Sequence, residues 1–295
     1  MADKKTILVT GANGQLGQEM KMVSALHTNY NYLFVAKEDL AIDDIEAVKN
    51  YFATNAIDYC VNCAAYTAVD KAETETDKAY LVNATAVGNL AMVCATKGIS
   101  FIHISTDYVF DGTATTPYKE EDLVSPVNLY GASKLEGEVL AMKNNPQSII
   151  IRTSWVYSSF GNNFVKTMLR LMSSRDAINV VSDQQGCPTY AADLAAAIMQ
   201  IIGQLEGSPK NNLLSSSAIF NYSNKGVINW YQFAEAIREL SGSKCVVSPI
   251  PASQYPTPAK RPAYSVMDTT KIQQIFNLEI PEWRDSLETC LKILG

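Results

Sequence analysis

The chain has 295 residues, of which 47% are hydrophobic and 18% are charged, and its formal net charge at pH 7 is −6. This length supports one large core or two joined domains, and the composition is that of a globular protein. The negative balance argues against a basic surface for nucleic acid or an anionic membrane, so an anionic ligand has to be bound by a local site.

The N-terminal residues are polar and lead directly into an apolar segment, which leaves no room for a signal peptide. No apolar stretch approaches the roughly 18 residues of a membrane span. We therefore expect a cytoplasmic protein.

Thr6–Thr10 is an apolar strand, and a turn with Gly11, Gly14 and Gly17 follows it. Glycines at a strand-to-helix turn let the backbone approach a pyrophosphate closely, and the N-terminus of the helix expected at 14–26 attracts its charge. The Gly-x-x-Gly-x-x-Gly spacing differs from the Gly-x-Gly-x-x-Gly dinucleotide fingerprint, so an ordinary turn is the alternative.

The second strand, at 32–36, ends before Lys37, Glu38 and Asp39. An acidic residue here favours the ribose of NADH, whereas a cation accepts the 2′-phosphate of NADPH. Because Lys37 comes first, we expect NADPH, with NADH as the alternative.

A helix near 44–54 and a strand at 57–64 come next. Cys60 and Cys63 in this strand have the spacing of a redox motif, but residues three apart point to opposite strand faces. We predict buried free thiols, and six cysteines are too few here for a disulfide framework. His27 and His103, the only histidines, have no second plausible ligand near them, so no zinc site is expected.

A long helix is expected at 77–97, followed by a strand at 101–105 that leads into Thr106. The next helix carries Tyr130 and Lys134 and runs to about 143. A tyrosine and a lysine four apart share one helix face. The ammonium lowers the pKa of the phenol toward the working pH, which makes Tyr130 a usable general acid or base.

A strand at 148–153 closes the alternating part of the chain. Beyond Trp155 we predict helices at 162–174, 191–203 and 230–241, separated by polar and proline-rich segments at 207–217 and 248–262.

This order predicts an α/β fold: a Rossmann-type doubly wound parallel sheet with a smaller, mostly helical C-terminal substrate domain. We assign residues 1–155 to the NAD(P)-binding domain, with later returns near 177–203 and 218–224. Residues 156–176 and 225–295 form the substrate-binding domain. Ligands bind beyond the carboxyl ends of parallel strands, so one cleft should collect the residues that follow them, which are Gly11, Ala65, Thr106 and Trp155.

Tyr130-x-x-x-Lys134 with an upstream Ser105-Thr106 resembles the extended short-chain dehydrogenase/reductase superfamily. Within it, the chain is similar to the dTDP-4-dehydrorhamnose reductase family along nearly its whole length, in blocks at 14–17, 62–73, 105–112, 152–157, 161–165, 183–189 and 261–265. The resemblance implies NAD(P)H-dependent reduction of the 4-keto group of dTDP-4-dehydro-6-deoxy-L-mannose to dTDP-L-rhamnose.

The resemblance also implies residue roles. Tyr130 donates the proton, Lys134 lowers its pKa and binds the nicotinamide ribose, and Thr106 hydrogen-bonds the carbonyl oxygen. The implied cofactor-binding residues are Gly11, Asn13, Gly14, Gln15, Leu16, Gly17, Lys37, Ala41, Ile42, Ala64, Ala65, Tyr66, Thr67, Tyr130 and Lys134. The implied substrate-binding residues are Val69, Thr106, Asp107, Trp155, Asn163 and Arg261.

Several of these positions have a structural alternative. Asp107 either binds sugar hydroxyls or caps the turn that follows its strand. Trp155 is either an aromatic wall for the sugar or a core residue. Arg261 either binds the substrate diphosphate or is solvated. Asn83 either orients Lys134 through its backbone or a water, or bonds within its own helix.

Tyr108 separates reduction from dehydration. Sugar-nucleotide dehydratases of this superfamily carry Asp-Glu after the threonine, and here Tyr108 replaces the glutamate. A phenol with an ordinary pKa is a poor base at neutral pH, so dehydration loses its base, whereas reduction needs none.

The chain departs from the family at two places. Ala41 replaces a carboxylate near the adenine pocket, so adenosine recognition rests on the backbone or on Asp39 or Asp43. Some members dimerise through magnesium held by glutamates; Glu19 matches one of these, but Ala192 stands where we align another. A single carboxylate is a poor magnesium cage, so no metal ligand is assigned, and both a monomer and a homodimer stay open.

Two other functions compete with the leading one. The first is a non-catalytic nucleotide-binding regulatory subunit of the same fold, and the second is a reductase of another nucleotide-linked ketosugar. Intact Thr106, Tyr130 and Lys134 favour an enzyme. Neither nucleic acid nor membrane is expected as a partner.

Overall fold

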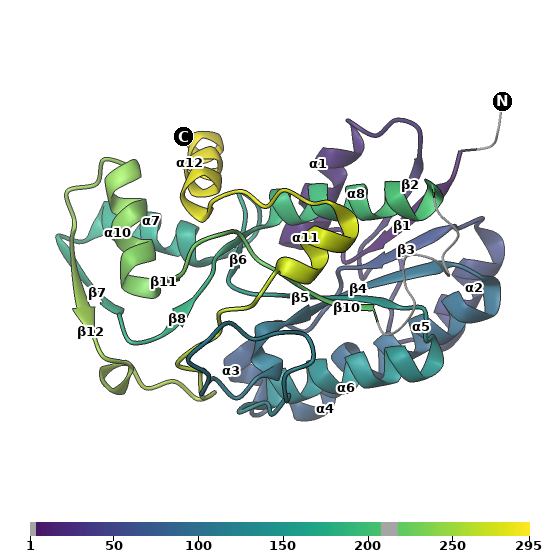
Figure 1. The fold of residues 1–295 in the computed structure, drawn as a ribbon, viewed down its shortest axis with the longest axis horizontal. Coiled ribbons are helices and arrows are strands. Elements are labelled where there is room, and N and C mark those ends of the chain that lie inside the picture. Colours follow the sequence, from purple (N-terminus) through teal and green to yellow (C-terminus); the bar gives the residue numbers. More distant parts are fainter. Residues whose placement is uncertain (1–3, 208–217) are drawn as a thin grey trace.

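A six-stranded, all-parallel sheet forms the centre of the protein (Figure 1), in a computed structural model that describes residues 4–207 and 218–295. Its strand order is β10-β5-β4-β3-β1-β2. The order reverses at β1, because β2 lies on one side of it and β3 on the other. The strands are β1 (Thr6–Thr10), β2 (Asn31–Val35), β3 (Tyr59–Asn62), β4 (Ser100–Thr106), β5 (Ile149–Thr153) and β10 (Ala218–Tyr222).

Helices cover both faces of this sheet, as two-sided burial of parallel strands requires. Neighbouring strand residues alternate between two cores: Ile7 and Val9 face one, and Leu8 faces the other. Residues of α1 (Gln15–Ser24), α8 (Ala191–Gly207) and α11 (Thr270–Phe276) complete the first core. Residues of α2 (Ile45–Thr54), α5 (Ala86–Lys97) and α6 (Leu129–Asn144) complete the second.

A third core holds the part of the molecule at the left of Figure 1. It is built from α7 (Phe164–Ser174), α10 (Trp230–Leu240) and α12 (Trp283–Leu294). Three short two-stranded pairings accompany these helices: β6 (Val156–Tyr157) with β9 (Thr189–Tyr190), β7 (Ala177–Val181) with β12 (Val246–Ile250), and β8 (Gln185–Gly186) with β11 (Ile228–Asn229). The remaining short elements are α3 (Val69–Ala72), α4 (Thr76–Tyr80), η1 (Leu81–Thr85), η2 (Asp107–Val109) and η3 (Ala252–Gln254).

The predicted α/β fold with a doubly wound parallel sheet is confirmed. The helix predicted at 77–97 is present as one uninterrupted helical segment, Thr76–Lys97, in which the π-helical turn η1 lies between α4 and α5. The sequence predicts that residues 177–203 return to the NAD(P)-binding domain. Within this range β7 pairs with β12 outside the main sheet, and only α8 packs on the main sheet. Conversely, α11 lies on the main sheet. The domain boundaries stay a prediction, and the polar segment at 208–217 lies outside the described residues.

Within the described ranges, one segment is long and apolar enough to cross a membrane, Thr76–Lys97, and 56% of its most apolar window is buried inside the protein. Its α5 part contributes Val87, Leu90 and Cys94 to the second core. The segment is therefore a core helix of this fold.

Candidate active site

The glycine turn lies at the point where the strand order reverses, which is where open α/β sheets bind ligands. Gly11 has φ +65°, and a Cβ there would lie 2.6 Å from the backbone nitrogen of Ala64, at the end of β3. A Cβ on Gly17 would lie 2.4 Å from the carbonyl oxygen of Gly11. No side chain caps α1 at Gly14, so the first N–H groups of that helix are available to an anion. The turn therefore fits a dinucleotide pyrophosphate.

A cleft of about 870 Å³ opens from this turn along the carboxyl ends of the strands. Most of the predicted residues line it, on both the cofactor side and the substrate side: Gly11, Asn13, Gly14, Gln15, Leu16, Lys37, Ile42, Ala64, Ala65, Tyr66, Thr67, Val69, Thr106, Asp107, Tyr130, Lys134 and Trp155. Four of the predicted residues are not among the lining residues: Gly17, Ala41, Asn163 and Arg261.

Asn163 acts one step behind the cleft. Its side-chain oxygen accepts the backbone N–H of Lys166 and so caps α7, while its Nδ2 donates to Gln15 Oε1 at 2.9 Å and to Ser158 O at 2.7 Å. The residue therefore ties α7 to Gln15, which does line the cleft.

Arg261 is occupied by an ion pair with Asp70. Its Nη1 and Nη2 donate to Asp70 Oδ1 at 2.8 Å and Oδ2 at 2.9 Å, and Nη1 also donates to Ala259 O. The Arg261 guanidinium holds the pKa of Asp70 below its usual value. The predicted contact of Arg261 with a diphosphate stays a prediction, and it requires Asp70 to give up part of this forked pair.

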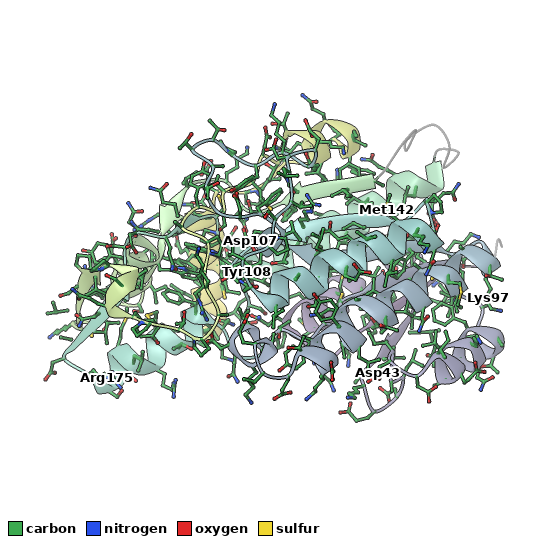
Figure 2. All side chains as sticks on the ribbon, turned by 90° about the horizontal axis from the view of Figure 1, so that it is seen from below. Asp43, Lys97, Asp107, Tyr108, Met142 and Arg175 are labelled. Atoms are coloured by element: carbon green, nitrogen blue, oxygen red, sulfur yellow. The ribbon has the colours of Figure 1, made fainter. Side chains whose placement is uncertain are left out.

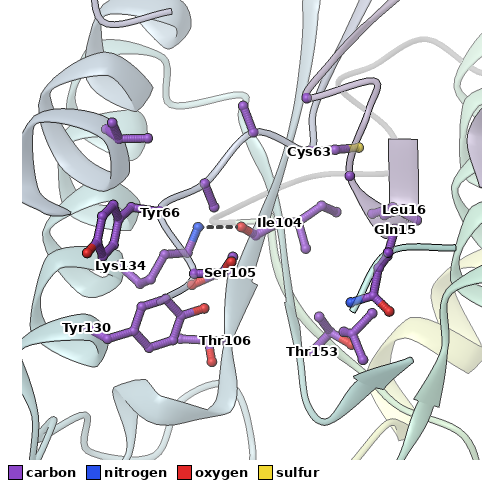
Figure 3. Close-up of a pocket in the computed structure, with 18 of the residues that line it drawn as sticks. Gln15, Leu16, Cys63, Tyr66, Ile104, Ser105, Thr106, Tyr130, Lys134 and Thr153 are labelled. Atoms are coloured by element: carbon purple, nitrogen blue, oxygen red, sulfur yellow. Dashed lines mark hydrogen bonds between the residues drawn. The ribbon is translucent and has the colours of Figure 1, made fainter. Parts of the chain in front are cut away.

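Tyr130, Lys134 and Thr106 come together at the base of the cleft (Figure 3). The side-chain oxygen of Asn128 caps α6 by accepting the N–H of Gly131, which fixes the helix start at Leu129, one residue before Tyr130. Thr106 ends β4 opposite this helix. The hydroxyl of neighbouring Ser105 donates to the buried carboxylate of Glu138, so it is Thr106 that presents its hydroxyl beside Tyr130.

The pKa of Tyr130 is raised, whereas the sequence predicts that it is lowered. Burial raises it to about 12, although hydrogen bonding with Thr106 lowers it. Lys134 does not reverse this effect, since its Nζ donates to Ile104 O at 2.7 Å (Figure 3) and burial lowers the pKa of Lys134 itself to about 8. A phenol that stays protonated at neutral pH is in the form that a proton donor needs.

Asp107 and Tyr108 lie in the middle of the molecule, between the ends marked by Lys97 and Arg175 (Figure 2). Asp107 is 2% exposed; its Oδ1 accepts from Thr106 Oγ1 at 3.0 Å, and its Oδ2 has no partner among the described residues. Burial raises the pKa of Asp107 to about 7. Thr106 caps the turn by accepting the N–H of Tyr108, and backbone hydrogen bonds of Asp107 and Tyr108 partly offset the rise in the pKa of Asp107.

Asp107→Asn should stabilise the protein at high pH. A carboxyl whose pKa is raised from 3.8 to about 7 in the folded state loses stability as pH rises through that range. After the cost of an unpaired amide, we expect a net gain of about 1–3 kcal/mol above pH 8, and none near pH 4. Denaturant unfolding of both proteins at the two pH values measures this, and an equal effect at both would contradict the ionisation account.

The side chain of Asn83 makes no hydrogen bond within its own helix, so that alternative is wrong, while the orientation of Lys134 through the backbone of Asn83 or a water stays a prediction. Asn83 is held in the π-helical turn η1, where it accepts the N–H of Tyr66 at 2.8 Å and donates to Tyr66 O and Ser133 Oγ. Turns of this kind widen a helix locally and recur at functional sites. Here the turn fixes the backbone of Tyr66, which lines the cleft.

The substrate end of the cleft has an aromatic wall that includes a residue sequence reasoning missed. Trp155 stacks on Trp230 with ring centroids 3.6 Å apart and planes 12° apart, and both line the cleft. The backbone of Trp155 has φ +47°, a strained value for a large side chain. A Cβ on Gly186 would lie 2.6 Å from the Trp155 ring. Trp230 carries no motif, and only the packing of α10 brings it here.

The ranges 4–207 and 218–295 contain no group of three or more His, Cys, Asp or Glu side chains placed to hold a metal ion. Glu19, the residue aligned with a magnesium ligand, is 5% exposed and accepts from Ser158 Oγ at 2.6 Å. All six cysteines are free; Cys63 is half-buried at the cleft, and the other five are buried.

The sheet reversal, the glycine turn and the Thr106, Tyr130 and Lys134 group define an NAD(P)-dependent oxidoreductase of the short-chain dehydrogenase/reductase type. The sequence pattern of the RmlD substrate binding domain matches residues 5–295. The chain is 41% identical over 284 residues to the dTDP-4-dehydrorhamnose reductase of Sinorhizobium fredii, which covers 95% of this chain and 94% of the relative. It belongs to the dTDP-4-dehydrorhamnose reductase family.

Solved structures agree with this assignment. The crystal structure of a dTDP-4-dehydrorhamnose reductase from Clostridium acetobutylicum is similar with a TM-score of 0.91 and 40% identity, covering 98% of this chain and 99% of that one. The enzyme of the same name from Bacillus anthracis, solved in complex with NADP, has a TM-score of 0.92 and 36% identity, covering 99% of this chain and 100% of that one.

Proposed function

We propose that this protein reduces the 4-keto group of dTDP-4-dehydro-6-deoxy-L-mannose with NADPH and forms dTDP-L-rhamnose. The observation that carries the proposal is the meeting of Tyr130, Lys134 and Thr106 in one cleft with a glycine turn that fits a pyrophosphate. The related reductases named above support the substrate, and the NADP complex of the Bacillus anthracis enzyme supports the cofactor.

Each residue has a defined part in this proposal. NADPH, when bound, supplies the hydride. Gly11, Gly14 and the N-terminus of α1 hold its pyrophosphate. Thr106 turns its hydroxyl from Asp107 Oδ1 to the ketone oxygen and donates to it, which aligns the carbonyl. Tyr130 transfers its phenolic proton to that oxygen as the negative charge develops. Lys134 binds the nicotinamide ribose.

The substrate side of the proposal is equally specific. The stacked Trp155 and Trp230 form a wall for the apolar face of the sugar, and the unpaired Oδ2 of Asp107 binds a sugar hydroxyl. Burial raises the pKa of Tyr108 above its usual range, so Tyr108 cannot serve as the base that dehydration needs. We place the reaction in the cytoplasm, with the protein as a monomer or a homodimer.

The decisive test is a coupled assay. Loss of NADPH absorbance is followed with dTDP-4-dehydro-L-rhamnose, and with GDP- and UDP-linked ketosugars as comparisons. The dTDP substrate should be turned over fastest. No turnover of any of them, with intact NADPH binding, would favour the regulatory subunit instead.

Lys37 should set coenzyme preference only weakly. It lines the cleft beside Glu38, and both are exposed, while Asp39 turns back to accept the N–H of Ala36. A partly exposed charge contact contributes about 1 kcal/mol or less, which is a preference of at most roughly tenfold. Lys37→Ala should raise the KM for NADPH several-fold and leave that for NADH nearly unchanged. An equal change for both coenzymes would show that Lys37 does not contact the 2′-phosphate.

A further inference from the structure

A chain of buried hydrogen bonds runs behind Lys134, away from the cleft, and it has no role in the reduction as proposed. Thr10 Oγ1 donates to Asn62 Oδ1 at 2.6 Å, Asn62 Nδ2 lies 3.0 Å from His103 Nδ1, and His103 Nε2 lies 3.2 Å from Lys134 Nζ. All four side chains belong to residues that are at most 1% exposed. Three adjacent strands of the sheet thus connect the end of β1 to the lysine.

The direction of these bonds fixes the tautomer of His103. The backbone N–H of Ala64 donates to Asn62 Oδ1 at 3.3 Å, so the amide oxygen faces this donor and Thr10, and the NH₂ group faces His103. His103 Nδ1 must then accept a hydrogen bond. Burial, aided by nearby Lys134, lowers the pKa of His103 well below its usual value, so the ring is neutral. Its one proton therefore sits on Nε2.

This tautomer points a donor at Lys134 Nζ. An ammonium has three donors and no lone pair, so it cannot accept a hydrogen bond from His103 Nε2–H. A neutral amine has a lone pair and can accept this hydrogen bond. The other titratable groups near Lys134 are Tyr130 and Glu138 on α6, and Tyr66, Lys78 and Asp107 along the cleft. Of these, Glu138 favours the ammonium.

We propose that His103 is a positioning residue, which holds Lys134 Nζ at the cleft and stabilises the amine form that Lys134 takes during each turnover. This inference rests on the proposed roles of Tyr130 and Lys134. After Tyr130 has given its proton to the ketone, an N–H bond of the ammonium breaks, and its proton restores the Tyr130 phenol through an intervening water molecule, because Nζ itself is bonded to Ile104 O. The electron pair stays on Nζ and accepts the hydrogen bond from His103 Nε2–H, until a proton from solvent restores the ammonium.

The tautomer can be measured directly in the wild-type protein. The chain has only two histidines, His27 and His103, so ring nitrogens labelled with ¹⁵N give two resolvable sets of NMR signals. We expect His103 to show a protonated Nε2 and an unprotonated Nδ1, unchanged from about pH 5 to about pH 9. A proton on Nδ1, or an imidazolium in this range, would overturn the proposal. This result does not depend on which sugar the enzyme reduces, so it is separate from a failure of the proposed function.

A pH profile tests the effect on Lys134. His103→Asn keeps an acceptor for Asn62 but removes the donor that faces Nζ. We expect the high-pH limb of kcat, and of the Kd for NADPH measured by fluorescence, to move up by about one pH unit. The rate below this limb should fall about tenfold, because the amine loses its partner. Ile102→Val, on the same strand and outside the cleft, is the matched control and should leave both limbs in place. A rate loss in His103→Asn with unmoved limbs would indicate a purely structural role.

Discussion

Tyr130→Phe is expected to lower kcat by roughly 100- to 10,000-fold, the range typical of lost general acid catalysis. The substitution removes only the hydroxyl. The ring stays, so its edge-to-face contact with Tyr108, at 5.8 Å between centroids, and the shape of the cleft are kept. The Kd for NADPH should therefore change little. Stopped-flow single turnover separates the chemical step from binding and measures the loss.

A matched control comes from Tyr157, a buried tyrosine of the third core that does not line the cleft. Its hydroxyl has no hydrogen-bond partner among the described residues. Tyr157→Phe therefore also removes one buried phenolic hydroxyl, and it should keep wild-type turnover. If Tyr130→Phe were as active as this control, Tyr130 would not be the proton donor, and the regulatory-subunit alternative would gain ground.

Residues that follow strand ends could be placed from the sequence because parallel topology itself gathers them. Gly11 after β1, Ala65 after β3 and Thr106 at the end of β4 meet at one edge of the sheet whatever the loops do. The helix that carries Tyr130 and Lys134 follows the same rule, since its start is fixed next to that edge by Asn128. The part of the cleft that we propose for the dinucleotide was predictable for this reason.

The substrate half depends on packing between segments far apart in the chain, and sequence patterns do not report it. Trp230 reaches the cleft only because α10 packs with α7 in the third core. The engagement of Arg261 by Asp70 joins residues 191 positions apart. The local sequence pattern contains no signal of either contact. Neither the proline-rich loop around Arg261 nor the helix that carries Trp230 indicates its distant partner.

Burial is the other quantity that the sequence could not supply. A lysine four residues from a tyrosine suggested a lowered phenol pKa, but this argument assumed that the ammonium is stable and faces the phenol. In the structure Lys134 is 1% exposed and bonded to Ile104 O, and desolvation raises the pKa of Tyr130 while it lowers that of Lys134. Desolvation acts on both groups toward their neutral forms, which neither residue spacing nor composition can show.

Lys134→Met is expected to damage both binding and rate, because one side chain is proposed to serve the nicotinamide ribose and the Tyr130 proton. Methionine fills a similar apolar volume, and it removes a buried amine whose desolvation is unfavourable, so the fold should survive. We expect kcat to fall at least about 100-fold and the Kd for NADPH to rise about tenfold.

Fluorescence titration with NADPH, steady-state kinetics and the thermal unfolding midpoint together measure the three consequences. An unchanged midpoint with weaker binding and a lower kcat is the expected pattern. Unchanged affinity would remove the ribose contact and leave Lys134 only its proton role. Unchanged kcat over repeated turnovers at saturating NADPH would remove the proton role instead, and with it the reason for His103 Nε2–H to face Lys134. If His103 acts only through Lys134, the double variant of His103→Asn and Lys134→Met should have the same kcat as Lys134→Met alone, because His103 lies behind the lysine and not in the cleft.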